Sequence, residues 1–127
     1  MKKIIQTDKA PAPIGPYNQA VMHGNTLYVS GQIAIDPATG ALIEGDIQAE
    51  TERCMQNLQA ILTEAGLSFD HVVKSTIFIK DMHQFALINE VYGRYFDADT
   101  APARETVEVA NLPKFVNVEI SVLAIGS

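Results

Sequence analysis

The sequence predicts a two-layer α+β domain, in which two helices cover one face of a single β-sheet. Two stretches, 47–65 and 82–97, place apolar residues at helical spacing. The segments around them are short and rich in β-branched and aromatic residues, a composition typical of strands. The chain has 127 residues, a length that suits one domain, and we expect residues 1–127 to form it.

The stretch 47–65 is the clearest helix. Asp46 is expected to cap its first turn, and Gly66 to end it in a left-handed conformation. The second helix, 82–97, follows Asp81 and Gln84, which have the spacing of a capping box. The two apolar stripes are Ile47, Cys54, Met55, Leu58, Ile61, Leu62 and Ala65 in the first helix, and Phe85, Ile88, Val91, Tyr92, Tyr95 and Phe96 in the second.

Strand patterns surround the two helices. The stretch 20–23 leads through a Gly24-Asn25 turn into the next strand, which predicts a hairpin. The predicted strands are 26–33, 72–80, 104–110 and 117–125, with a short additional one at 3–6. The resulting order is β-β-α-β-α-β-β, and Pro- and Gly-rich residues 9–19 are expected to be extended, irregular backbone.

Alternation in the last two strands assigns their side chains to faces of the sheet. Val118, Ile120, Val122 and Ala124 are expected to face the helices, and Glu119 the opposite side, which we infer to be the face of Arg104 and Thr106. The helix-free face is then semi-polar. It also carries Phe78, Leu123 and Ile125, and such exposed apolar area favours coverage by another subunit.

Charge and composition exclude several classes of function. Nine basic and fifteen acidic residues give a formal charge of -6, so we expect no nucleic-acid partner, and an anionic substrate requires a dedicated cation. The single cysteine, Cys54, permits no intrachain disulfide, which fits a reducing compartment. No apolar run approaches the roughly 18 residues of a membrane span, so we expect a cytoplasmic protein without membrane attachment.

Motifs for metals and nucleotide cofactors are missing. His23, His71 and His83 do not have metal-ligand spacing, so no metal site is expected. Neither a phosphate-binding loop nor a dinucleotide fingerprint is found, so we expect no cofactor. Arg104 can bind a carboxylate through its planar fork, and Glu119 is costly to bury alone. The pattern by itself favours an ion pair between these two residues and leaves an anion site as the alternative.

Several short segments stand in a characteristic order along the chain. They are 12–19, 29–33, 73–81, 102–104, 107–109, 112–114 and 118–120, together with Asn89, Tyr92 and Phe96. Near the C-terminus, Pro102-Ala103-Arg104 is followed by the strand around Glu119. In this joint order the segments resemble the signatures of the reactive-intermediate deaminase family (RidA/YjgF), and the resemblance runs nearly from end to end.

The resemblance implies a chorismate-mutase-like fold, a mixed sheet and a homotrimer with three clefts between subunits. It implies hydrolysis of 2-imino or 2-enamino acids, such as 2-aminoacrylate and 2-iminopropanoate, to 2-keto acids and ammonia. Arg104 would then bind the substrate carboxylate, and Glu119 would position water and transfer a proton. The residues implied to line the cleft are Tyr17, Ser30, Gly31, Asn89 and Thr106, with Gly31 acting through its backbone.

One departure and two alternatives accompany the resemblance. Many members have Ser-Cys where this chain has Glu105-Thr106, and alternation predicts that Glu105 points away from the cleft. A non-catalytic sensor of 2-keto or amino acids would use Arg104 in the same way without needing Glu119. A ribonuclease or translation inhibitor, a label also attached to the family, is disfavoured by the charge of -6.

Overall fold

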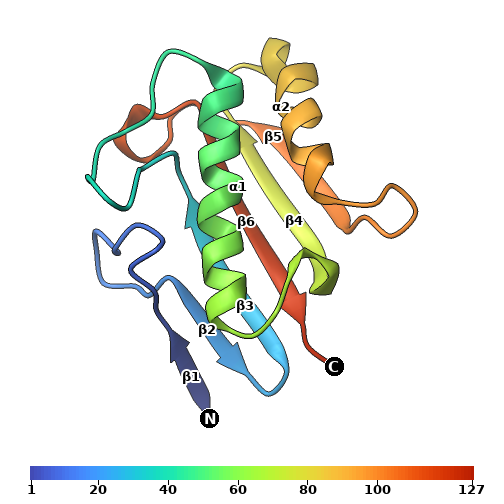
Figure 1. The fold of residues 1–127 in the computed structure, drawn as a ribbon. Coiled ribbons are helices and arrows are strands. Elements are labelled where there is room, and N and C mark those ends of the chain that lie inside the picture. Colours follow the sequence, from blue (N-terminus) through green and yellow to red (C-terminus); the bar gives the residue numbers. More distant parts are fainter.

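The computed structural model describes residues 1–127 as one six-stranded sheet with two helices on one face (Figure 1). The strand order is β1-β2-β3-β6-β4-β5; only β4 and β5 pair in parallel, so the sheet is mixed. The elements are β1 (Lys2–Ile5), β2 (Ala20–His23), β3 (Thr26–Gln32), α1 (Ile47–Glu64), β4 (Val72–Ile79), α2 (Phe85–Tyr92), β5 (Ala103–Glu108) and β6 (Val118–Ile125). The predicted α+β class is confirmed.

Helix α1 forms as its sequence predicts. The Asp46 side chain accepts hydrogen bonds from the backbone N–H groups of Gln48 and Ala49, and Gly66 ends the helix with φ of 77°. Its apolar stripe is buried against β3 and β6. Cys54 is part of this core, and burial raises the pKa of its thiol.

The second helix is shorter than predicted. The stretch 82–97 divides into a 3₁₀ turn at Met82–Gln84, helix α2, and a second 3₁₀ turn at Gly93–Tyr95. Asp81 caps only the first turn, by accepting from the His83 N–H, so the expected capping box does not form. At the other end, the rings of Tyr95 and Phe96 pack on Phe69, with centroids 5.1 and 5.3 Å away. Aromatic packing there outweighs the helical spacing.

Strand β6 runs through the middle of the sheet and supports the core. Its alternate residues Val118, Ile120, Val122 and Ala124 are all buried beneath the helices, as predicted. The opposite face, here called the open face, carries no helix (Figure 1). Exposed apolar side chains lie on it, including Tyr28, Val107 and Ile125. No helix of the chain has the length and apolarity needed to cross a membrane.

Strand register places Arg104 and Glu119 on opposite faces of the sheet. Arg104 pairs with Ser75, which pairs with the buried Val122, so Arg104 faces the helix layer. Glu119 pairs with Phe78 on the open face. The expectation that the two residues share a face is therefore wrong. Alternation fixes faces only within one strand, whereas the relation between β5 and β6 depends on their common register with β4.

Candidate functional site

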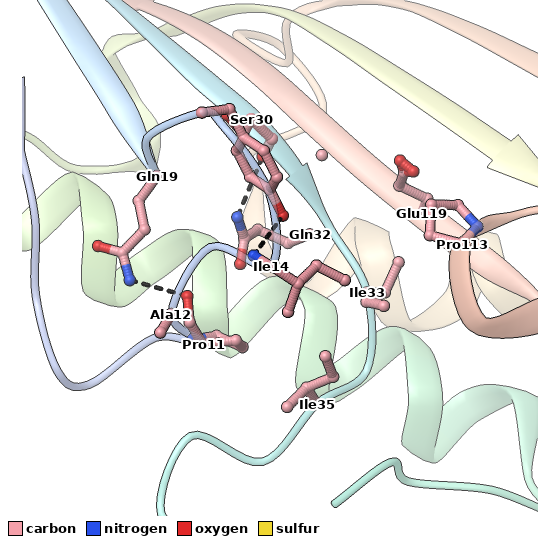
Figure 2. Close-up of a pocket in the computed structure, with 12 residues that line it drawn as sticks. Pro11, Ala12, Ile14, Gln19, Ser30, Gln32, Ile33, Ile35, Pro113 and Glu119 are labelled. Atoms are coloured by element: carbon pink, nitrogen blue, oxygen red, sulfur yellow. Dashed lines mark hydrogen bonds between the residues drawn. The ribbon is translucent and has the colours of Figure 1, made fainter. Parts of the chain in front are cut away.

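A pocket of about 370 Å³ lies where β3 ends beside β6 (Figure 2). Most of its wall is apolar, and Glu119 supplies the one carboxylate. The lining residues are Pro11, Ala12, Ile14, Tyr17, Gln19, Ser30, Gly31, Gln32, Ile33, Ile35, Pro113 and Glu119. Four residues that the sequence selected, Tyr17, Ser30, Gly31 and Glu119, are thus brought together.

A β-bulge in β3 shapes the pocket. The register pairs Val29 with Val122 and Gln32 with Ile120, which leaves both Ser30 and Gly31 opposite Ser121. Val29 and Gln32 are both buried, so the extra residue restores their orientation and turns the Ser30-Gly31 peptide out of the regular ladder. The sequence pattern did not predict this irregularity.

Gly31 and Glu119 meet at the bulge. A β-carbon built on Gly31 would lie 2.5 Å from Oε1 of Glu119 and 2.7 Å from its Cδ. The backbone at Gly31 is not in the left-handed region, so the requirement for glycine comes from this close approach. The missing side chain leaves the space in which the carboxylate lies.

The Glu119 carboxylate has no hydrogen-bond or ion-pair partner within the chain. It is half-buried, and this desolvation raises its pKa above the usual value. A carboxylate of that kind takes up and releases a proton more readily near neutral pH than an exposed one. The residue is chemically suited to general acid–base work.

The N-terminal wall of the pocket is held by backbone and hydroxyl contacts. Ser30 donates its hydroxyl to the Asn18 carbonyl at 2.6 Å, and its N–H to the Gln19 carbonyl at 2.9 Å. The Tyr17 hydroxyl accepts from the Ile14 N–H at 3.4 Å. These bonds fold residues 11–19 over the end of β3, where the sequence predicted irregular backbone.

Arg104 belongs to a second group, here called the arginine cluster: Arg104, Phe85, Asn89 and Tyr92. The guanidinium donates to Oδ1 of Asn89 at 2.6 Å and lies 5.5 and 5.1 Å from the ring centroids of Phe85 and Tyr92. The three partners follow the i, i+4, i+7 spacing of one face of α2. This arrangement orients a cation while most of its five N–H donors have no partner in the chain.

Thr106 lies two residues beyond Arg104 on the same side of β5. Its hydroxyl oxygen is buried and has no hydrogen-bond partner, which is a rare and costly state for a polar atom. Glu105 points to the open face, where it forms an ion pair with Lys74 at 2.9 Å. Glu105 therefore points away from Arg104 and lies on the face of the sheet that carries Glu119.

The selected residues therefore form two groups that lie apart from each other within a single chain. The pocket holds Tyr17, Ser30, Gly31 and Glu119, whereas Arg104, Asn89 and Thr106 lie on the other side of the sheet. The ion pair between Arg104 and Glu119 that the pattern favoured is not formed. No group of three or more His, Cys, Asp or Glu side chains is placed to hold a metal ion.

Known proteins match the chain over almost its whole length. A family model described as endoribonuclease L-PSP matches residues 7–126. The chain belongs to this family. A RutC family protein of Synechocystis is 52% identical, with 97% of this chain and 95% of the relative covered. A mouse relative, 2-iminobutanoate/2-iminopropanoate deaminase, is 44% identical, with 98% and 92% covered.

Solved structures agree with the family assignment. A putative endoribonuclease from Thermotoga maritima has a TM-score of 0.96 and 52% identity, covering 100% of this chain and 99% of that one. Escherichia coli TdcF with bound serine has a TM-score of 0.92 and 45% identity, covering 98% and 99%. RidA from an Antarctic Psychrobacter has a TM-score of 0.93 and 44% identity, covering 98% and 99%. The RidA/YjgF resemblance is confirmed.

Proposed function

We propose that this protein hydrolyses 2-imino and 2-enamino acids to 2-keto acids and ammonia, in a site completed by a second copy of the chain. The observation that carries the proposal is the unpaired Glu119 carboxylate, half-buried against Gly31 in a mainly apolar pocket. The deaminase name of the mouse relative supports the same reaction.

Glu119 supplies the acid–base steps. A protonated imine has an electrophilic carbon, so water adds to it as Glu119 takes one water proton, giving a neutral carbinolamine. Glu119 then returns that proton to the nitrogen. The C–N bond breaks and ammonia leaves, while the hydroxyl gives its proton to the Glu119 carboxylate and becomes the keto oxygen. Transfer of that proton to the departing ammonia forms ammonium and restores the carboxylate. Holding water and imine side by side supplies much of the remaining acceleration.

Arg104 binds the substrate carboxylate in this proposal. Its planar fork offers two parallel N–H donors, and the contacts with Phe85, Asn89 and Tyr92 hold the fork before substrate arrives. The buried Thr106 hydroxyl, on the same side of β5, has no partner in the chain, and a small local movement would let it contact a water or a substrate oxygen. The cation thus supplies the binding that a protein of charge -6 otherwise disfavours.

Assembly joins the two groups. Arg104 and Glu119 lie on opposite sides of one sheet, so one small substrate reaches both only if they come from different copies. β5 is an edge strand, and Tyr28, Val107 and Ile125 expose apolar area on the open face. We propose a closed homotrimer, in which each of three equivalent interfaces forms one site.

A coupled assay tests the function. An amino-acid oxidase generates imines from several amino acids, and loss of each imine is followed with and without this protein. Faster loss, abolished in Glu119→Gln, supports the deaminase. Binding of 2-ketobutanoate without any acceleration would contradict it and support a keto-acid sensor instead.

A further inference from the structure

The two facing walls of the pocket consist of irregular backbone. One wall is formed by Pro11, Ala12 and Ile14, and the other by Ile33 and Ile35 (Figure 2). Both segments lie outside the named strands and helices, apart from a single bridge between Ile35 and Leu42. Sheet hydrogen bonds therefore do not set the distance between the walls.

A buried glutamine holds the first wall. Gln19 is 2% exposed, and its amide nitrogen lies 2.9, 3.1 and 2.9 Å from the carbonyl oxygens of Thr7, Ala10 and Pro11. Its amide oxygen accepts from the Thr7 N–H at 2.8 Å. One side chain thus fixes four backbone groups of the N-terminal segment, and Figure 2 shows its bond to Pro11.

A buried asparagine holds the second wall from the opposite side. Asn57 lies on α1 with no exposed surface, and its amide nitrogen donates to the carbonyls of Ile33 and Ile35, each at 3.1 Å. Its oxygen accepts from Nε of Arg53 at 3.0 Å, which orients the amide. A polar side chain is thereby satisfied inside the apolar face of a helix.

We propose that Gln19 and Asn57 are positioning residues, two buried amides that set the width of the pocket by tying each wall to the core. This inference rests on the proposed function. The walls contact the same part of the substrate before and during reaction, so displacing them weakens ground-state and transition-state binding alike. The expected kinetic effect is a raised KM with a nearly unchanged kcat, unlike that of removing Glu119.

The test uses Gln19→Met and Asn57→Leu, which preserve size and remove the donors. Each is expected to raise KM about tenfold while kcat stays within about threefold. The matched control is Thr51→Val, which removes a buried hydroxyl that donates to the Ile47 carbonyl within α1. It is expected to lower the melting temperature without changing KM.

Hydrogen exchange gives a second, independent measurement. Exchange is expected to speed up at the Thr7 amide in the Gln19 variant, and at the Ile35 and Ile43 amides in the Asn57 variant. If either variant fails to fold, the milder Gln19→Asn and Asn57→Ser replace them. If the wild-type protein hydrolyses no imine, the proposed function is wrong. The role of the two amides can still be tested in that case, because hydrogen exchange at the wall residues does not depend on activity. Unchanged KM in folded variants, or unchanged exchange at these amides, overturns the inference.

Discussion

The carboxylate of Glu119 lies in the space that a side chain at position 31 would take, 2.5 Å from where the β-carbon would be. Gly31→Ala is therefore expected to move the carboxylate, because the end of the glutamate side chain is more mobile than the backbone at position 31. A displacement of about 1 Å at a catalytic group can lower the rate by about 10²-fold. Steady-state imine hydrolysis measures this effect.

Gly93→Ala is the matched control for that substitution. Gly93 has helical φ of −64°, and a β-carbon added there would have nothing within 4 Å, so activity is expected to stay at the wild-type level. The Gly31 variant is expected to keep its melting temperature within a few degrees. Full activity in folded Gly31→Ala would show that the position of the carboxylate does not matter.

Removing the charge of Glu119 separates catalysis from binding. Glu119→Gln keeps the size and loses proton transfer, so turnover is expected to fall by about 10²–10⁴-fold. The dissociation constant for 2-ketobutanoate, measured by calorimetry, is expected to change little because the proposal assigns the main contact to Arg104. Equal losses in binding and turnover would instead assign Glu119 to substrate binding.

The same variant is expected to change how stability depends on pH. Desolvation raises the folded-state pKa of Glu119 above 4.5, so between these two values the folded chain binds more protons than the unfolded one. The stability contributed by the protonated group is complete below pH 4.5 and is lost as pH rises through the folded-state pKa. The melting temperature of Glu119→Gln relative to wild type is therefore expected to rise as the pH increases from 4.5 through the folded-state pKa of Glu119. A constant difference across this range would contradict the shift.

Arg104 is expected to control carboxylate binding. Arg104→Ala removes one side of a desolvated charge contact, which costs roughly 2–5 kcal/mol of binding. Arg104→Lys is also expected to fail, because an ammonium cannot reproduce the fork that Asn89 orients. Arg94→Ala is the control, since Arg94 is exposed and pairs only with Glu90. Wild-type affinity for 2-ketobutanoate in Arg104→Ala would remove the residue from the site.

Mixing two inactive variants tests whether the site is shared between copies. Arg104→Ala and Glu119→Gln chains, unfolded together and refolded at equal concentrations, form some interfaces with both native residues. Each shared site takes Arg104 from one copy and Glu119 from another. In a random mixture each of these two residues is native with a probability of about one half, so about a quarter of the sites are complete and about a quarter of wild-type activity is expected. No recovery, or a single 13.8 kDa species in sedimentation equilibrium, would contradict the shared site.

The elements with strong local patterns were predictable from the sequence. Helix α1 has a long stripe, a cap at Asp46 and a stop at Gly66, all of which depend on neighbouring residues. The second helix was overestimated because its last aromatic residues keep helical spacing while packing on Phe69. Contacts with residues far away in the sequence decide where such a helix ends, and the residue spacing within one segment gives no information about those contacts.

The sequence selected candidate site residues but did not predict their arrangement. Arg104 and Glu119 were selected by their chemistry, yet their faces depend on register through β4. Gln19 and Asn57 were missed, although Asn57 left a signal as a polar residue beside Leu58 in a buried stripe. Its partners, the Ile33 and Ile35 carbonyls, carry no side-chain signature at all.

The separation of Arg104 from Glu119 across the sheet also has a consequence for activity at low protein concentration. A site divided between copies does not exist in an isolated chain, so in the proposed assembly the activity per chain falls on dilution. In the proposed assembly, newly synthesised chains are inactive until they associate with other copies. In that assembly, total activity would rise more steeply than chain concentration wherever the concentration is near the dissociation constant of the oligomer.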